Sequence, residues 1–197
     1  MKKAELTYLA LSEHALSGRK EPLTQLALSK KLGLSLSVIN KAIAPLREIG
    51  AVQVKQRSLQ IQDSKKLLLF WATSRRLGKD IIYATRVDLP VSQIEKQMPS
   101  GVLFTAYSGY KFLFSEVPAD YSEVYVYSDE WRLREIKKRF PKKEGPPNLF
   151  VLTAEKAVFT ASESAVALLP QIYVDLWNLP QWYAKEFLNA LEKRLGW

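Results

Sequence analysis

Several kinds of residue and motif are missing from this 197-residue chain, and each absence excludes a class of site. There is no cysteine, which excludes disulfides, thiolate metal sites and cysteine nucleophiles and fits a reducing cytoplasm. The one histidine, His14, cannot form a zinc site alone. Neither a P-loop nor a glycine-rich dinucleotide-binding motif occurs, so no nucleotide cofactor is expected.

Long apolar runs are missing as well. The run at 67–72 is among the longest, and it is far shorter than the roughly 20 residues that a membrane-spanning helix needs. The chain begins Met-Lys-Lys-Ala-Glu-Leu, with no apolar run after the positive charges, which makes it a poor secretory signal. We therefore expect a soluble cytoplasmic protein without a membrane partner.

Positive charge is concentrated in the first part of the chain. Residues 1–79 contain fifteen Lys and Arg against five Asp and Glu, whereas residues 80–197 contain fourteen against fifteen. This asymmetry is typical of a nucleic-acid-binding segment joined to a segment with another role. The length also allows two small domains, so we predict a DNA-binding head at 1–79 and a body at 80–197.

The head is predicted to contain a third helix with one apolar side. Apolar residues at helical spacing cover 5–16 and 23–32. Ser35 is placed to cap the helix that follows. The apolar stripe of that helix, which should face the core, consists of Leu36, Ile39, Ile43, Leu46 and Ile49.

The opposite side of this helix is predicted to bind DNA. Residues 51–62 alternate between apolar and polar and turn back at 56–58, so the head has the pattern of a winged helix-turn-helix. Small and hydrogen-bonding residues let a helix approach base edges in the major groove, and basic residues at a hairpin tip suit phosphate or minor-groove contacts. The predicted DNA-binding residues are Ser35, Ser37, Asn40, Lys41, Ala44, Arg47, Lys55 and Arg57.

Other basic residues of the head are expected to be solvated or to face phosphates rather than to read bases. They are Lys30, Lys31, Lys65, Lys66, Arg75 and Arg76. Asp63 or Ser64 is expected to cap a further helix at 65–77, which is too apolar for a free linker and joins the head to the body.

Short strands and helices interleave in the body, which predicts the α/β or mixed α+β class. The predicted strands are 81–87, 123–127, 149–152 and 171–175. The predicted helices are 91–98, 102–114, 130–140 after a cap at Asp129, and 181–195. The aromatic residues of 102–114 leave both helix and strand open for that segment.

Two segments of the body, together with the winged helix before them, resemble the AbiEi antitoxins. They are 103–109, Leu-Phe-Thr-Ala-Tyr-Ser-Gly, and 169–176, Leu-Pro-Gln-Ile-Tyr-Val-Asp-Leu, which a helix follows. AbiEi proteins are transcriptional regulators of type IV toxin–antitoxin systems in phage abortive infection. The resemblance covers most of the chain. It implies a head that represses its own operon and a nucleotidyltransferase-like α/β body that is needed for antitoxin action.

The body lacks the parts of an active nucleotidyltransferase. Such an enzyme needs a Gly-Ser turn for the triphosphate and paired carboxylates for two metal ions. Here the order is reversed in Ser108-Gly109, and no Asp-x-Asp or Asp-x-Glu pair follows on a strand. Asp175, expected at a strand end, is the one acid singled out as a functional candidate; the alternative is a carboxylate that caps a turn or binds backbone amides. We expect no catalytic residue, metal site or cofactor.

These patterns lead to one main hypothesis and two alternatives. The main hypothesis is a non-enzymatic repressor that binds double-stranded operator DNA and acts as an antitoxin, with a nucleotidyltransferase-type toxin as protein partner. The first alternative is a winged-helix regulator whose body senses a small ligand in a pocket lined by Tyr107, Tyr110, Tyr125 and Trp131. The second, which the missing carboxylate pair disfavours, is a metal-dependent nucleotidyltransferase.

Overall fold

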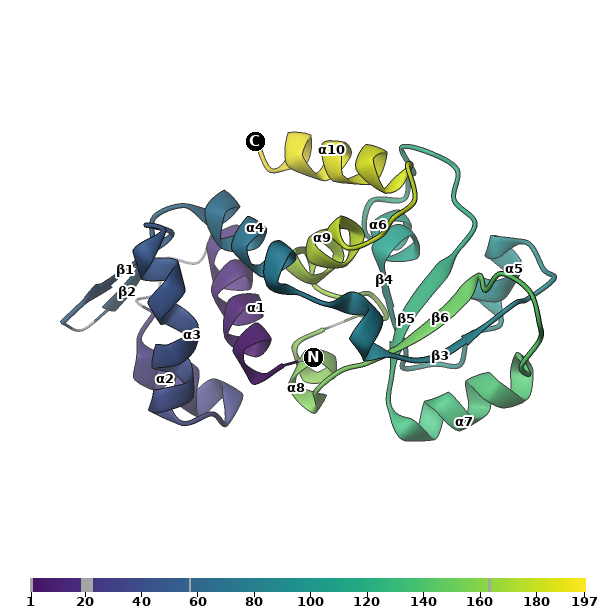
Figure 1. Cartoon of the computed structure of the whole chain (residues 1–197), viewed down its shortest axis with the longest axis horizontal. Helices are drawn as coiled ribbons and strands as arrows, with labels where there is room; N and C mark the ends of the chain where they lie inside the picture. Colours follow the sequence, from purple (N-terminus) through teal and green to yellow (C-terminus); the bar gives the residue numbers. More distant parts are fainter. Residues whose placement is uncertain (1, 19–22, 57, 163) are drawn as a thin grey trace. The chain divides into compact units, whose positions relative to one another are not determined.

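The structure is a computed structural model, and it describes residues 2–18, 23–56, 58–162 and 164–197 (Figure 1). The chain divides into two compact units, Met1–Arg75 and Arg76–Trp197, so the first unit ends slightly before the boundary expected after Lys79. Helices and two sheets occur together, which confirms the mixed α/β class.

The first unit consists of helices followed by a hairpin and a closing helix. The helices α1 (Lys3–Leu16), α2 (Gln25–Leu32) and α3 (Leu36–Glu48) precede the antiparallel strands β1 (Val52–Lys55) and β2 (Ser58–Ile61), and α4 (Ser64–Ser74) comes last. The backbone N–H of Leu59 donates to the carbonyl of Leu23 at 2.7 Å, so the residues before α2 also pair with the hairpin.

Short polar side chains start these helices. Thr24 accepts a hydrogen bond from the backbone N–H of Ala27 at 3.0 Å, and Ser35 accepts one from Val38 at 3.4 Å. Asp63, and not Ser64, caps α4 by accepting from Lys66 at 2.8 Å. Gly33 ends α2 in the left-handed region, with φ of 63°, which permits the sharp turn into α3.

The core of the first unit is formed by α1, α3 and α4. Its fully buried side chains include Leu11, Ile39, Ile43, Leu67 and Trp71. Arg75 belongs to this core too: it is 2 % exposed and donates a hydrogen bond to the carboxylate of Glu5. The expectation that Arg75 is solvated or faces phosphates was wrong, because Arg75, which directly follows α4, turns its side chain toward α1 rather than toward solvent.

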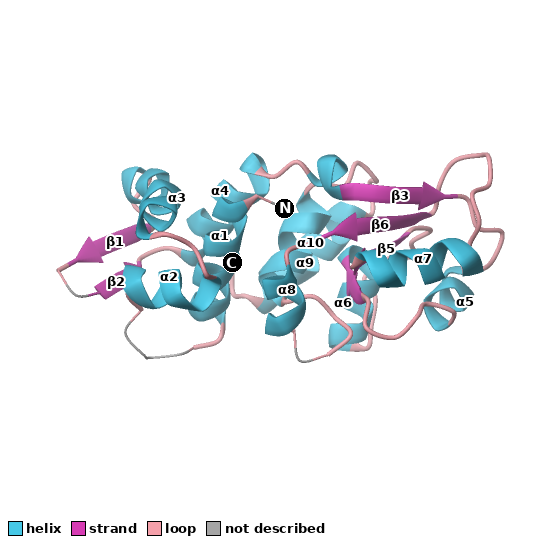
Figure 2. Cartoon of the chain, turned by 90° about the horizontal axis from the view of Figure 1, so that it is seen from below, coloured by secondary structure: helices cyan, strands magenta, loops and turns pink. Residues whose placement is uncertain are grey.

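The second unit is built on a four-stranded sheet with the order β3-β6-β5-β4 (Figure 2). The strands are β3 (Ile81–Thr85), β4 (Leu103–Thr105), β5 (Val124–Ser128) and β6 (Leu149–Thr153). The neighbours β5 and β6 are parallel, and the outer strands β3 and β4 run antiparallel to them. A short 3-10 helix, Leu77–Asp80, leads into β3.

Helices cover both faces of this sheet. They are α5 (Val91–Lys96), α6 (Ala106–Phe114), α7 (Glu130–Arg139), α8 (Lys156–Ala161), α9 (Leu169–Trp177) and α10 (Ala184–Arg194). On one face, Ile94 of α5 and Ile136 of α7 pack with Val124 and Val126 of β5. The alternate residue Tyr125 points to the other face, where its ring contacts Tyr107 of α6.

The sequence prediction for the second unit was wrong in one segment, partly right in another and incomplete in a third. Residues 171–175 lie in the helix α9 and not in a strand, and 102–114 is divided between β4 and α6. The helix α9 is buried from Pro170 to Leu176, and its polar residues Gln171 and Asp175 are buried as well, so it lacks the exposed polar side that is typical of a surface helix. The short helix α8 was not predicted.

Candidate nucleic-acid interface

The helix α3 presents a polar side to solvent. Its core side consists of Ile39, Ala42, Ile43 and Leu46, each at most 2 % exposed. The predicted DNA-binding residues Ser35, Ser37, Asn40, Lys41, Ala44 and Arg47 are all exposed. This side of the helix is therefore open to a ligand along its whole length, and the contact of these residues with DNA stays a prediction.

The two ends of the predicted apolar stripe do not belong to the core. Leu36 is 44 % exposed and Ile49 is 40 % exposed, because they lie at the first turn of α3 and just beyond its end. Pro45 is accommodated inside the helix, which continues to Glu48. The expectation that Leu36 and Ile49 face the core was thus wrong.

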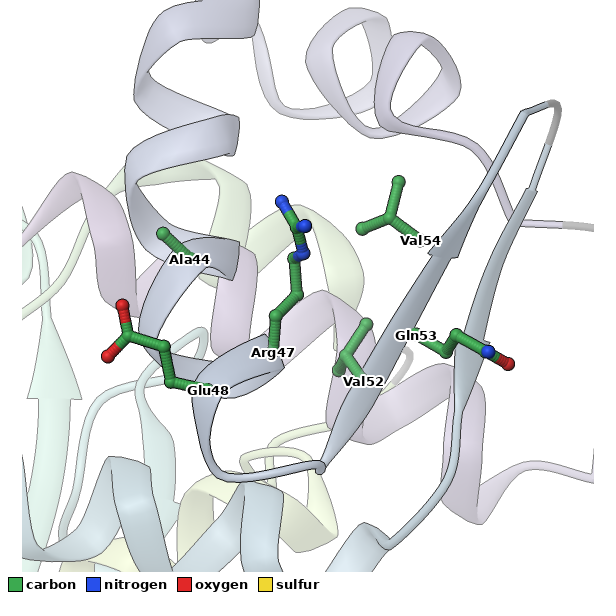
Figure 3. A pocket seen from close by; sticks show the side chains of 6 residues that line it. All are labelled: Ala44, Arg47, Glu48, Val52, Gln53 and Val54. Carbon is green, nitrogen blue, oxygen red and sulfur yellow. The ribbon is translucent and has the colours of Figure 1, made fainter.

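A hollow of about 450 Å³ separates the end of α3 from β1 (Figure 3). Ala44, Arg47 and Glu48 line it from the helix, and 52–54 line it from the strand. The side chain of Arg47 extends into the space between the two elements, whereas Glu48 points away from the strand (Figure 3). A guanidinium group in this position can reach an anion that lies along the groove between helix and hairpin.

A second hollow, of about 470 Å³, lies between the start of α2, the start of α3 and the hairpin. Two of its lining residues, Leu26 and Leu36, are 53 % and 44 % exposed. Exposed aliphatic side chains beside a polar helix suit contact with a thymine methyl group. Sequence reasoning missed this pair, because apolar spacing alone assigned Leu36 to the core and did not single out Leu26.

The hairpin adds exposed polar groups to the same region. Lys55 is exposed at the end of β1, and it also lines the second hollow. Gln62 donates a side-chain hydrogen bond to Gln53 at 3.3 Å across the hairpin. Arg57, the other basic residue predicted at the tip, lies outside the described residues.

The surface of the first unit is predominantly basic. Lys31 forms an ion pair with Glu13, with 3.6 Å between Nζ and Oε2. Exposed Lys and Arg in the described part of this unit are Lys2, Lys3, Lys30, Lys31, Lys41, Arg47, Lys55 and Lys66. Such a surface attracts the phosphate backbone of a nucleic acid.

Asp175, the acid singled out in the sequence as a functional candidate, is inside the second unit. It is 0 % exposed, and Oδ2 accepts hydrogen bonds from the hydroxyls of Thr105 and Tyr127, both at 2.7 Å. Its Oδ1 accepts a further bond from Nε2 of Gln171 at 2.9 Å. The carboxylate thus ties α9 to β4 and β5. This role is structural, as in the alternative, but the donors are side chains and not the expected turn or backbone amides.

Ser108 and Gly109 lie inside α6, not in a phosphate-binding turn. A Cβ atom on Gly109 would be 3.0 Å from the carbonyl oxygen of Phe104 and 3.1 Å from Cγ1 of Ile172, so this glycine allows α6 to pack closely on β4 and α9. In the described ranges, no three His, Cys, Asp or Glu side chains gather where they could hold a metal ion.

The four aromatic residues of the ligand-sensing alternative do not surround one pocket. Tyr107, Tyr110 and Tyr125 are at most 4 % exposed and belong to the packed aromatic cluster around α6. Trp131 is 68 % exposed on α7, which covers the opposite face of the sheet. The grouping was wrong because Trp131 lies on α7, whereas the three tyrosines pack around α6 on the other face of the sheet.

In comparisons with protein-family models, curated proteins and solved structures, no match to this chain was found. No described helix has the length and apolar character needed to cross a bilayer.

Proposed function

We propose that this chain is a transcriptional repressor whose first unit binds operator DNA as a winged helix, with α3 in the major groove. The observation that carries the proposal is the exposed side of α3, which offers small, amide and basic side chains at Ser37, Asn40, Lys41 and Arg47. The hairpin β1–β2 supports it, because it directly follows α3 and places Lys55 beside the same groove.

We further propose, from the resemblance to AbiEi proteins, that the chain represses its own operon and is the antitoxin of a type IV toxin–antitoxin system. The second unit would have a nucleotidyltransferase-like shape and act by binding rather than by catalysis. In support, helices and strands alternate from α5 to β6. The strand β5 carries the buried aromatics Tyr125 and Tyr127, and no carboxylate pair, on the side facing α6 and α9.

DNA reading by α3 is tested with duplexes selected from a randomised library by the full-length protein. The variant Asn40→Ala/Lys41→Ala should bind the selected duplex more weakly by about 1–3 kcal/mol and should lose much less on a scrambled duplex. Lys66→Ala, an exposed lysine at the start of α4, is the control and should lose similar amounts on both. If the α3 variant loses the same binding free energy on both duplexes, Asn40 and Lys41 contact phosphates and do not read bases.

The antitoxin role is tested in cells that express a nucleotidyltransferase-type toxin encoded beside the gene. The full chain should restore growth and repress a reporter behind its own promoter, and the α3 variant should restore growth without repression. Failure of the full chain to restore growth contradicts the antitoxin proposal. Incubation with magnesium, labelled nucleoside triphosphates and RNA should give no transfer; transfer that disappears in Asp175→Asn would identify an enzyme instead.

A further inference from the structure

The second unit carries a concentrated basic segment that its near-neutral total charge conceals. Residues 130–143 contain seven Lys and Arg against two Asp and Glu, whereas the rest of 80–197 contains seven against thirteen. These fourteen residues comprise α7 and the beginning of the loop after it. Positive charge is thus gathered on one element of an otherwise acidic unit.

The helix α7 separates its apolar and basic residues onto opposite sides. Leu133, Ile136 and Phe140, at spacings of three and four, pack against the face of the sheet that carries Val124 and Val126 of β5. Trp131, Arg134 and Lys138 have the same spacings, are offset by two residues and are all exposed. The three outward residues therefore form one stripe, about 10 Å long from Trp131 to Lys138.

The charges of this stripe are available to a ligand. In the described part of the chain, neither Arg134 nor Lys138 has a carboxylate partner within ion-pair distance, in contrast to Arg139, which is paired with Glu135. At the edge of the stripe, Nζ of Lys137 lies 5.4 Å from the ring centre of Tyr83. The guanidinium carbon of Arg132 lies 6.0 Å from the ring centre of Trp131.

Trp131 indicates which polyanion fits this stripe. Although the guanidinium group of Arg132 lies over Trp131, the tryptophan is 68 % exposed, so part of its ring surface is accessible for stacking. Stacked base pairs of a duplex do not expose a base face to such a ring, whereas an unpaired base does, and proteins that bind single strands combine aromatic platforms with phosphate-binding Lys and Arg.

We propose that the outward face of α7 binds single-stranded nucleic acid, with a base stacked on Trp131 and the adjacent phosphates bound by Arg134 and Lys138. This activity is separate from duplex binding by α3 and does not rest on it. RNA and single-stranded DNA share the chemistry that the face recognises, and they differ in the 2′-hydroxyl group.

The experiment titrates the full-length protein into labelled oligouridine RNA and oligothymidine DNA of about 12 nucleotides and follows fluorescence anisotropy. Trp131→Ala should weaken binding about tenfold or more, and Trp131→Phe should lose less because a ring remains. Trp182→Ala is the matched control, since Trp182 is 75 % exposed in the turn between α9 and α10, and it should leave binding unchanged.

The phosphate contacts are tested by the dependence of binding on salt. Each phosphate that a protein neutralises on a single strand contributes about 0.7 to the slope of log affinity against log salt. Arg134→Ala/Lys138→Ala removes two such cations and should therefore reduce this slope by about 1.4. Lys185→Ala/Lys193→Ala, which removes two exposed lysines from α10, should leave the slope unchanged.

Each outcome decides the proposal. Loss of single-strand binding in the α7 variants but not in the controls supports it. A preference for RNA or for DNA then identifies the strand bound, whereas equal binding shows that the face does not recognise the 2′-hydroxyl group. Absence of single-strand binding at low salt, or equal effects of Trp131→Ala and Trp182→Ala, overturns it. The proposal is also overturned if the α7 variants lose binding to duplex DNA but keep binding to single strands. The variant Asn40→Ala/Lys41→Ala tests only duplex binding by α3, so its outcome is independent of this proposal.

Discussion

The guanidinium group of Arg75, at the end of α4, donates a hydrogen bond to the carboxylate of Glu5 in α1, and both side chains are buried. The indole Nε1 of Trp71 donates to the same carboxylate at 3.5 Å. Residues that are 70 positions apart in the sequence are thereby joined, so the pair connects the first and last helices of the first unit.

We predict that Arg75→Ala strongly destabilises the protein. Removing one partner of a buried ion pair leaves the other charge buried and uncompensated, which costs about 3–5 kcal/mol. Arg76→Ala, at the exposed neighbouring position, should change the free energy of unfolding by less than about 0.5 kcal/mol. Denaturant unfolding of both variants measures the difference, and similar stabilities would show that the pair contributes little.

The hydrogen bonds of Asp175 lead to a second stability prediction. Two hydroxyls donate to Oδ2 and the amide of Gln171 donates to Oδ1, whereas an asparagine has only one acceptor oxygen. Asp175→Asn should therefore leave at least one buried donor unmatched and lower the free energy of unfolding by about 1–3 kcal/mol. Asp120→Asn, at an exposed position, is the control; an equal effect of both would contradict the structural role of Asp175.

Elements with one side exposed to solvent were predicted from their period, whereas the buried strand β5 was predicted from its β-branched and aromatic residues. The helix α7 has a capping Asp129 and an apolar residue at every third or fourth position, and the hairpin alternates, because each contacts the core on one side only. The helix α9 is buried from Pro170 to Leu176, and its β-branched and aromatic residues are typical of a strand. The four-residue spacing of the buried Gln171 and Asp175 was the one helical signal, and two residues are too few to establish a period.

The candidate interface was predictable from the sequence only where it depends on the helical period of α3. The exposed side of α3 follows from its apolar side, since both are set by the helical period. The exposure of Leu36 depends on how α2 and the hairpin pack around the start of α3, and the burial of Asp175 depends on Thr105 and Tyr127, which are distant in sequence. Such long-range contacts leave no local signal.

Buried tyrosines should make the protein less stable at alkaline pH. Burial, and next the hydrogen bond to Glu123, raises the pKa of Tyr183 to about 12, and burial also raises the pKa of Tyr107, Tyr125 and Tyr173. An unfolded tyrosine loses its proton near pH 10, so above that pH the unfolded chain binds fewer protons than the folded chain. The contribution of Tyr183 to the free energy of unfolding should be fully present below about pH 10 and should be lost as the pH rises toward 12.

Urea unfolding at several pH values between about 8 and 11 measures this decline, and Tyr183→Phe should make it less steep. A constant free energy of unfolding across this range would contradict a contribution of the tyrosines to the pH dependence of stability. A decline that Tyr183→Phe does not change would contradict the contribution of Tyr183.

Duplex binding by the first unit should depend steeply on salt, because neutralised phosphates release their counterions. Lys55, exposed at the end of β1, is expected to contact a phosphate rather than a base, so Lys55→Ala should weaken binding equally on selected and scrambled duplexes. The slope of log affinity against log salt should also fall by about 0.9, the value for one phosphate contact on a duplex. Lys185→Ala, on α10 of the second unit, is the control and should change neither quantity.

Titrations of the full-length protein across a salt series test both expectations. An affinity independent of salt would contradict an electrostatic basis for DNA binding. A loss of affinity in Lys55→Ala that is confined to the selected duplex would show that Lys55 contacts a base rather than a phosphate.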